Sequence, residues 1–275
     1  MTTKILLTGA TGFVGRQVLD ALQKKDVELV LVVRSGSEKK IQSNKSISQI
    51  IFSDDIFSES IQWWEKAFQN IDIVIHMAWF VEPGKYLHSE HNIDCYKGSV
   101  KIAKGSINSK VKRFISIGTC FEYELSSSAL TINSPLNPLT PYAQAKVKLY
   151  KKLSSLLPEN NIEFAWCRLF YLYGEYEDQR RFVPYLRSQL KIGKIAKLSS
   201  GKQIRDFMDV SEAGHAIADV ALSKIKGAIN VCSEKPISIR ELAENIADEY
   251  GRKDLLNFGA REDNKFDPPY IVGKR

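Results

Sequence analysis

Hydrophobic positions along the first two-thirds of the chain follow two different periods. Short runs of aliphatic and β-branched residues predict buried strands, and longer stretches with apolar residues three and four positions apart predict amphipathic helices. The expected strands are Ile5–Thr8, Glu28–Val33, Gln49–Phe52, Ile71–His76, Arg113–Ile117 and Phe164–Leu169. The expected helices are Val14–Lys24, Glu59–Gln69, Asn92–Ile107 and Tyr142–Leu157. Strands that alternate with helices indicate a parallel sheet that is covered by helices on both faces.

The pattern changes after Tyr173-Gly174, where elements shorten and glycine, charged and aromatic residues become more frequent. The elements expected there are helices Phe182–Leu190, Ser211–Ser223 and Ser238–Tyr250, and strand Ala228–Val231. We therefore predict an α/β protein in two parts. Residues 1–173 form a Rossmann-type doubly wound parallel sheet that binds the cofactor. Residues 174–275 form a smaller α/β substrate lobe, interleaved with the first part, at the carboxyl edge where such sheets bind ligands.

The composition is that of an ordinary globular protein, with 275 residues, 44% hydrophobic and 26% charged. The longest apolar runs are too short to cross a bilayer. The N-terminal residues lead directly into the first expected strand, with no cleavage-type sequence after them. We therefore expect a cytoplasmic protein without a membrane partner.

The titratable residues predict neither a metal site nor a nucleic-acid partner. The four cysteines are widely spaced without a C-x-x-C pair, and the four histidines show no metal-ligand spacing. The net charge of +7 comes from lysines and arginines spread along the chain, without a basic block. A cofactor and a substrate that both carry phosphates would account for this sign.

A glycine-rich turn follows the first strand and begins the first helix. In Thr8-Gly9-Ala10-Thr11-Gly12-Phe13-Val14-Gly15, three glycines allow a tight turn, a close approach of a pyrophosphate and close helix–strand packing. The first turn of the helix offers free N–H groups to the anion. We predict dinucleotide binding by Gly9, Thr11, Gly12, Phe13, Val14 and Gly15.

The end of the second strand indicates which dinucleotide binds. NAD sites place an acidic residue there to hold the ribose 2′-hydroxyl, whereas this chain has Arg34. A guanidinium can bind a 2′-phosphate through two hydrogen bonds, so we predict NADP(H), with Arg16 as a second candidate contact and NAD(H) left open. Asp55 and Ile56, after the third strand, are expected at the adenine edge, although Asp55 would also suit a solvated turn.

Tyr142 and Lys146 lie one turn apart on one face of a predicted helix. An ammonium close to a phenol lowers the pKa of the phenol toward the working range of an acid–base catalyst. Tyr270 and Lys274 have the same spacing, so spacing alone decides little. The first pair is distinguished by its position, because its helix follows the fifth strand of the sheet that begins at the glycine turn.

Several motifs in this order resemble the extended short-chain dehydrogenases/reductases of the nucleotide-sugar branch, which includes epimerases, 4,6-dehydratases and 4-keto reductases. The motifs are the glycine turn, Ile73-Val74-Ile75-His76-Met77-Ala78, Tyr142 with Lys146, Arg168-Leu169-Phe170-Tyr171-Leu172-Tyr173-Gly174 and Gly201-Lys202-Gln203-Ile204-Arg205-Asp206-Phe207. The resemblance implies that Thr119 is a third catalytic residue, which shares the substrate oxygen with Tyr142. It also implies cofactor contacts at Met77, Ala78, Trp79, Ile117 and Phe170, together with Tyr142 and Lys146.

The residues after Thr119 separate the reactions of this family. Sugar 4,6-dehydratases carry Asp-Glu there for the elimination of water, whereas this chain has Cys120-Phe121. That leaves a 4-keto reductase, which usually uses NADPH, and a 4-epimerase that retains NAD. Arg34 favours reduction of the C4 ketone of a 4-keto-6-deoxy nucleotide-diphospho-sugar, for deoxysugars of surface polysaccharide. A non-catalytic NADP-binding regulator is a remote alternative.

The resemblance further implies how the substrate and a second copy would bind. Arg205 and Arg261 would contact the nucleotide diphosphate, because two guanidiniums suit two phosphates. Tyr171 is expected to contact the substrate, and Val183 is expected either to line the sugar or base pocket or to pack in the core. Members of the family often pair through the helices expected at Asn92–Ile107 and Tyr142–Leu157, so we expect a homodimer.

Overall fold

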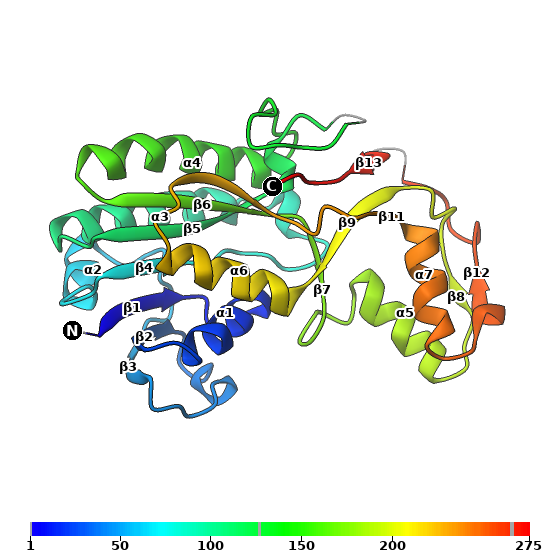
Figure 1. Cartoon of the computed structure of the whole chain (residues 1–275), viewed down its shortest axis with the longest axis horizontal. Helices are drawn as coiled ribbons and strands as arrows, with labels where there is room; N and C mark the ends of the chain where they lie inside the picture. The colour runs from blue at the N-terminus through cyan, green and yellow to red at the C-terminus, as the bar shows by residue number, and fades with distance from the viewer. Residues whose placement is uncertain (1, 126–127, 265–266) are drawn as a thin grey trace.

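The computed structural model describes residues 2–125, 128–264 and 267–275, and its main feature is a seven-stranded sheet (Figure 1). The strand order is β10-β6-β5-β4-β1-β2-β3, and every neighbouring pair is parallel. The strands are β1 (Thr3–Thr8), β2 (Val27–Val33), β3 (Ile47–Phe52), β4 (Ile73–His76), β5 (Arg113–Thr119), β6 (Glu163–Leu169) and β10 (Gly227–Val231). The predicted doubly wound parallel sheet is therefore confirmed.

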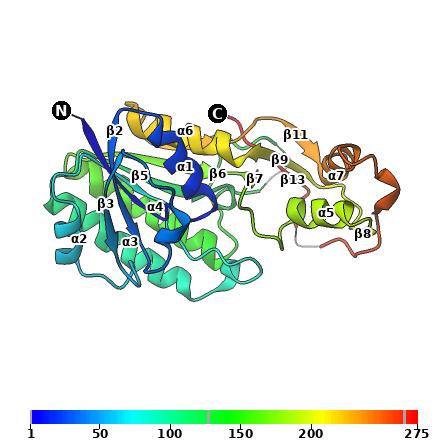
Figure 2. The same ribbon diagram turned by 90° about the horizontal axis from the view of Figure 1, so that it is seen from below.

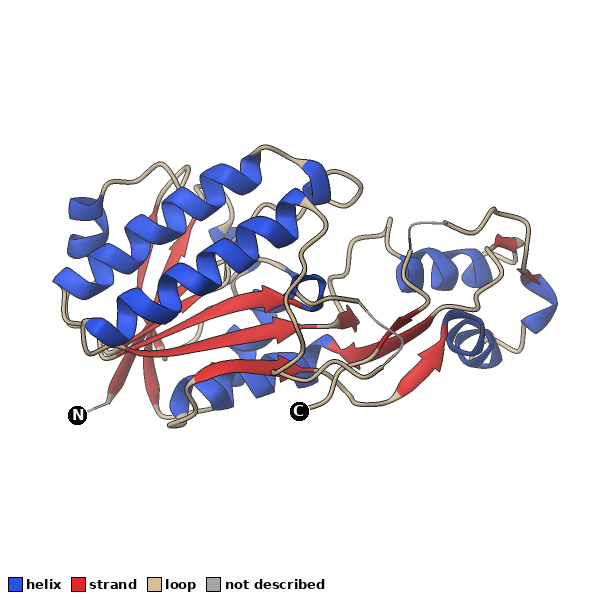
Figure 3. Cartoon of the chain, turned by 90° about the horizontal axis from the view of Figure 1, so that it is seen from above, coloured by secondary structure: helices blue, strands red, loops and turns tan. Residues whose placement is uncertain are grey.

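Helices cover both faces of this sheet, as its apolar strands require. Helices α1 (Phe13–Gln23) and α6 (Val210–Leu222) lie on one face. Helices α2 (Ile61–Ala67), α3 (His91–Asn108) and α4 (Pro141–Glu159) lie on the other, where Figure 3 shows them side by side. The 3₁₀ helices are η1 (Glu38–Lys40), η2 (Tyr86–His88), η3 (Cys120–Glu122) and η4 (Lys253–Leu255).

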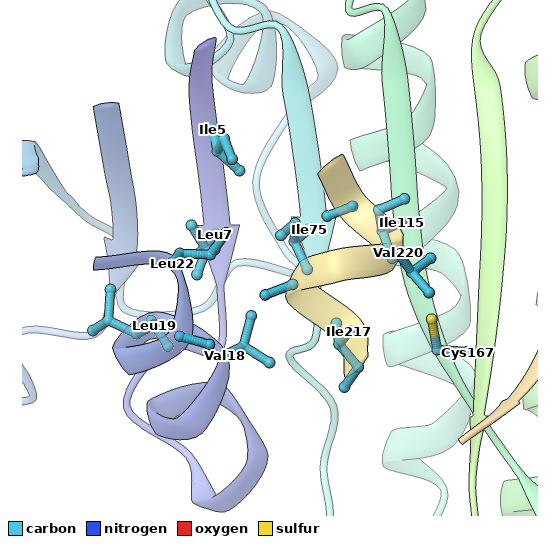
Figure 4. Packing of buried hydrophobic residues seen from close by; sticks show 14 of the residues in the cluster. Ile5, Leu7, Val18, Leu19, Leu22, Ile75, Ile115, Cys167, Ile217 and Val220 are labelled. Atoms are coloured by element: carbon cyan, nitrogen blue, oxygen red, sulfur yellow. The ribbon is translucent and has the colours of Figure 1, made fainter. Parts of the chain in front are cut away.

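Each face of the sheet has its own hydrophobic core. On the α1 and α6 side, Leu7 and Ile75 of the sheet pack with Val18, Leu22 and Ile217 of the helices (Figure 4). On the other side the core is rich in aromatic residues, among them Trp64, Phe68, Phe114 and Trp166. Both cores are almost completely buried, so the sheet is a rigid support for the residues at its edge.

The second lobe contains a small sheet that the hydrophobic pattern did not predict. Its strands are β7 (Tyr171–Tyr173), β9 (Ile204–Asp209), β11 (Pro236–Ser238) and β13 (Tyr270–Ile271). Helices α5 (Phe182–Lys191) and α7 (Ile239–Asp248) and the short pair β8 (Ala196–Lys197) and β12 (Leu256–Asn257) complete the lobe (Figure 2). A third core, which includes Leu186, Leu190 and Ile246, fills the space between these elements.

The chain crosses between the two lobes more than once. Although α6 and β10 follow residue 173, α6 packs against α1, and β10 pairs with β6 in the main sheet. The buried carboxylate of Asp206 accepts hydrogen bonds from the backbone N–H groups of Ser233, Glu234 and Gly273, which ties β9 to the segment after β10 and to the C-terminal segment. The division of the chain at residue 173 stays a prediction.

The outer faces of α3 and α4, through which a homodimer was expected, are strongly basic. Their exposed and half-exposed side chains include Lys97, Lys101, Lys104, Lys148, Lys151 and Lys152. Pairing of two such faces would bring like charges together, which is unfavourable at low salt. The homodimer stays a prediction. Within the described residues, no helix is both long and apolar enough to span a bilayer, and no cluster of three or more His, Cys, Asp or Glu side chains could hold a metal ion.

Replacing Gly214 by valine should destabilise the fold, because the backbone of α1 leaves no room for a side chain there. A Cβ at Gly214 would lie 2.6 Å from the carbonyl carbon of Gln17. Overpacking of this kind costs about 1–3 kcal/mol, and urea denaturation would measure it. His215→Val, at the exposed neighbouring position, should change the free energy of unfolding by about 0.5 kcal/mol or less. Equal losses in the two variants would contradict this account of the packing between α1 and α6.

Candidate active site

The glycine turn has the shape of a phosphate cradle. Gly9 has a φ of +78°, and a Cβ there would lie 2.7 Å from the backbone nitrogen of Ala78. A Cβ at Gly15 would lie 1.9 Å from the carbonyl oxygen of Gly9. Helix α1 begins at Phe13 without a side-chain cap, so its first N–H groups remain available to an anion. The turn, with Met77 and Ala78 beside it, fits the pyrophosphate of a dinucleotide.

His76 holds the end of β4 beneath this cradle. Its Nδ1 lies 2.7 Å from Oγ1 of Thr8, and its Nε2 lies 2.7 Å from Oγ of Ser99. Burial, and then the charge of Lys146, lower the pKa of His76 to about 3. The imidazole is therefore neutral and links β1, β4 and α3 as a structural element of the site.

The residues predicted at the adenosine end of the cofactor differ in their surroundings. Arg34 follows β2 and is exposed, and its side chain makes no hydrogen bond or ion pair with the described residues. Arg16, in contrast, donates to the carbonyl of Thr11 and lies 4.1 Å from the ring centroid of Tyr176. The carboxylate of Asp55 accepts from the backbone N–H of Phe57. Their contacts with a cofactor stay predictions.

Two other predicted cofactor residues are part of hydrophobic cores. Ile56 is buried on the α2 and α3 side of the sheet. Phe170 is buried in a fourth core beside Cys120 and Cys232, where it also leaves no room for a Cβ at Gly273. Both residues pack the walls below the site, and a direct contact of either with the cofactor stays a prediction.

Tyr142, Lys146 and Thr119 come together at the carboxyl edge of the sheet, between β5 and α4. Helix α4 begins with Thr140, whose Oγ1 accepts from the N–H of Ala143, and this places Tyr142 in the first turn. The hydroxyl of Tyr142 is hydrogen-bonded to Thr119. Nζ of Lys146 donates to the carbonyl of Ile117 over 2.8 Å. The structure thus brings the three predicted catalytic residues together.

The ammonium of Lys146 faces an indole. Its Nζ lies 3.7 Å from the ring centroid of Trp79, whose Nε1 donates to Oδ1 of Asn92 over 2.8 Å. A cation over an aromatic face is stabilised electrostatically. Trp79 therefore contacts the predicted catalytic lysine directly.

Burial shifts the pKa values of the two helix residues in opposite directions. It lowers the pKa of Lys146 to about 7. It raises the pKa of Tyr142 above the ordinary value of a phenol, and the hydrogen bond from Thr119 only partly opposes this. The expected lowering of the tyrosine pKa by Lys146 is therefore wrong for this arrangement, because the ammonium faces Trp79 and Ile117. Tyr142 is a neutral phenol at pH 7, and a neutral phenol can donate a proton.

A buried ion pair, not anticipated from the sequence, lies behind Thr119. Nε of Arg168 donates to the carboxylate of Glu122 over 2.7 Å, and both side chains are almost completely buried. The sequence does contain a signal for this pair, because Glu122 and Arg168 are charged residues near the ends of two apolar strands, and buried charges need partners. The pairing of β5 with β6 supplies that partner.

Tyr86, which packs against Tyr142, and Arg181, which lies near Tyr86, also escaped sequence reasoning. The ring of Tyr86 in η2 meets the ring of Tyr142 edge-on, with centroids 4.9 Å apart. The guanidinium of Arg181, at the start of α5, lies 5.6 Å from the ring centroid of Tyr86. Tyr86 thus connects the predicted catalytic tyrosine to the second lobe.

The residues predicted for the substrate lie in three places. Arg205 is buried, forms an ion pair with Asp267 at 2.8 Å and lies 5.3 Å from the ring centroid of Tyr171. Arg261 is exposed and lies over the ring of Tyr185. Val183 lines a cavity of about 480 Å³. The structure therefore joins Arg205 and Tyr171, and all four substrate assignments stay predictions.

Comparisons with known proteins agree with this geometry. A family model described as "NAD dependent epimerase/dehydratase family" matches residues 5–232. A dTDP-6-deoxy-L-talose 4-dehydrogenase (NAD(+)) of Aggregatibacter actinomycetemcomitans is 26% identical over 98% of this chain and 99% of its own length. A CDP-abequose synthase of Salmonella muenchen is 25% identical, over 94% of this chain and 84% of its own. A UDP-N-acetylglucosamine 4-epimerase structure from Methanobrevibacter ruminantium has a TM-score of 0.87 at 22% identity, covering 100% and 90% of the two chains.

Replacing Lys146 by methionine should stabilise the fold at low pH while it removes the charge of the site. The pKa of Lys146 is about 7 in the folded protein and 10.5 in an unfolded chain. Between pH 7 and pH 10.5 the lysine therefore takes up a proton when the protein unfolds. The burial cost of the charge is complete below pH 7 and disappears toward pH 10.5. We expect Lys146→Met to add about 1–2 kcal/mol at pH 6 and less at pH 9, measured by urea denaturation. Lys151→Met, at an exposed position of α4, should show no such difference. An equal gain at both pH values would rule out the buried charge.

Proposed function

Because the chain belongs to the NAD dependent epimerase/dehydratase family, we propose that this nucleotide-sugar enzyme reduces the C4 ketone of a 4-keto-6-deoxy nucleotide-diphospho-sugar with NADPH. The observation that carries the proposal is the neutral phenol of Tyr142, hydrogen-bonded to Thr119 at the edge of the cofactor cradle. A group that holds its proton is suited to donate it to an oxygen that is becoming an alkoxide. The names of the talose dehydrogenase and the abequose synthase support a deoxysugar as substrate.

In the proposed reduction, each residue of the site has a separate role. A nicotinamide bound at the cradle would supply the hydride for the C4 carbon. Tyr142 donates its phenolic proton to the carbonyl oxygen, and Thr119 holds that oxygen with a second hydrogen bond. Lys146, one turn along α4, would bind the nicotinamide ribose through its ammonium, and solvent returns the proton to Tyr142. Cys120 and Phe121 supply no acid–base pair, so an elimination of water has no catalyst at these positions.

The cofactor cradle fits a dinucleotide because a side chain at Gly9 or Gly15 would fill it. The first N–H groups of α1 would hold the pyrophosphate, and Arg34 would hold a 2′-phosphate. The free side chain of Arg34 supports NADP(H) over NAD(H). Arg205, which lies beside Tyr171, would bind the substrate diphosphate once Asp267 releases it.

A 4-epimerase that retains NAD is the second candidate. Tyr142, Lys146 and Thr119 would serve both directions of hydride transfer equally well. Relatives and structures named as 4-epimerases support this candidate, whereas NAD(+) in the name of the talose dehydrogenase bears only on the choice of cofactor. The reductase would consume external cofactor, and the epimerase would not. The products of the reductase would supply deoxysugars to surface polysaccharide.

Purified protein should consume NADPH when a 4-keto-6-deoxy nucleotide sugar is added. Tyr142→Phe should lower kcat by about 10²- to 10⁴-fold, because it removes the proton donor, while the Kd of NADPH changes little. Loss of absorbance by the reduced cofactor and titration of tryptophan fluorescence would measure the two quantities. Tyr96→Phe, on α3, is the matched control. Protein that carries bound NAD and interconverts sugars without consuming NADPH would instead establish the epimerase.

Arg34→Ala should discriminate between the two cofactors. A guanidinium that binds a 2′-phosphate contributes about 1.5–3 kcal/mol, so KM for NADPH should rise about 10- to 100-fold and KM for NADH should not change. Initial rates with each cofactor at saturating sugar substrate would measure this. Lys24→Ala, which removes an exposed charge at the end of α1, should leave both values unchanged. Equal effects on NADPH and NADH would contradict a 2′-phosphate site at Arg34.

A further inference from the structure

The carboxylate of Glu122 lies completely buried behind the active site and receives only hydrogen-bond donors. Oε1 accepts from the backbone N–H of Thr119 over 2.8 Å and from Nε1 of Trp166 over 3.0 Å. Oε2 accepts from Nε of Arg168 over 2.7 Å. Burial raises the pKa of Glu122, but these donors and the charge of Arg168 oppose the shift. Because every contact is a donor, the group is held as the carboxylate.

The carboxylate fixes the backbone from which Thr119 projects. Glu122 and Thr119 form a capping box at η3, in which the N–H of Phe121 also donates to Oγ1 of Thr119. A Cβ at Gly118 would lie 2.4 Å from Oε1 of Glu122 and 2.2 Å from Nε1 of Trp166. The carboxylate is therefore enclosed on the side of the strand as well. Any movement of it would move the hydroxyl that contacts Tyr142.

Among the charged groups around Lys146, the carboxylate of Glu122 has the largest electrostatic effect on the pKa of the lysine. Trp166 donates to Glu122 through Nε1, and the face of its ring lies 5.9 Å from Nζ of Lys146. The charge of Glu122 raises the pKa of Lys146 against the effect of burial. The other groups that face Lys146 are Cys95 of α3 and His76 of β4, whose pKa values of about 11 and about 3 leave them neutral at pH 7.

We propose that Glu122 is a positioning residue of this site, which holds the backbone of Thr119 in place and keeps Lys146 in its ammonium form. The kinetic part of this inference rests on the proposed reduction. A role in stability alone is a weaker explanation, because a buried ion pair is often replaced by apolar residues without loss of stability. Burial of the pair also requires the desolvation of two charges, which is unfavourable. Glu122 contacts the backbone of Thr119 directly and is connected to Lys146 through Trp166.

The test compares three variants of the full chain. Glu122→Gln leaves Arg168 without its counter-charge and can fail to fold, so the double variant Glu122→Leu, Arg168→Met removes both charges together. The control is Tyr123→Phe, which removes a buried hydroxyl bonded to Arg168 and Asn230 but not to Thr119. Far-ultraviolet circular dichroism and urea denaturation establish that each variant is folded before kinetics are measured.

We expect the double variant to lower kcat by about 10- to 100-fold, because misplacement of a catalytic group has this effect, with KM for the cofactor within twofold of the wild type. The pH above which kcat falls should move down by roughly one unit, since Lys146 and Tyr142 both lose the influence of the carboxylate on their pKa. Tyr123→Phe should keep the kcat and the pH profile of the wild type. Wild-type kcat and pH profile in the double variant would overturn the proposal.

A second arm needs no substrate and separates this inference from the proposed function. Lys146→Met is introduced into the wild type and into the double variant, and the free energy of unfolding is followed from pH 5 to pH 10. The pH below which the methionine adds its full stability should be lower in the double variant than in the wild type. If the wild type reduces no sugar nucleotide, the proposed function fails while this arm still decides the role of the charge. Identical pH dependence in the two backgrounds would overturn that role.

Discussion

The parallel register between β5 and β6 decides where the polar groups beneath the active site lie. Gly118 is paired with Arg168, and Ser116 with Trp166. This pairing directs the guanidinium and the indole nitrogen toward the turn that follows β5, where Glu122 receives both. A slip of one residue would turn these side chains to the other face of the sheet. The position of Thr119, and with it the hydrogen bond to Tyr142, depends on this register.

Burial is the second constraint, and it shifts the pKa values of several groups at the site. The imidazole of His76 is neutral, the phenol of Tyr142 keeps its proton, and Lys146 titrates near pH 7. These are the states in which a site of low dielectric constant holds groups with few charged neighbours. At neutral pH the phenol of Tyr142 therefore carries its proton.

Much of the main sheet could be predicted from the sequence, because its strands are apolar runs and its helices have a regular apolar face. Tyr142, Lys146 and Thr119 could be predicted because local motifs and their order place them. The small sheet could not, because β9 carries Arg205 and Asp206, whose partners lie far away in the sequence. Glu122, Tyr86 and Arg181 depend in the same way on contacts between elements that no local pattern reports.

The contacts of Asn230 indicate which parts of this region can form first while the chain is being synthesised. It accepts from the hydroxyl of Tyr123, which in turn contacts Arg168, and it donates to the carbonyls of Leu130 and Lys274. A nascent chain that has emerged only as far as β6 already contains Thr119, Tyr142 and Lys146. It lacks Asn230 and the C-terminal segment, whose hydrogen bonds join β10 to Leu130 and Lys274. The three predicted catalytic residues are thus made early, whereas the full set of contacts of Asn230 can form only after Lys274 has left the ribosome.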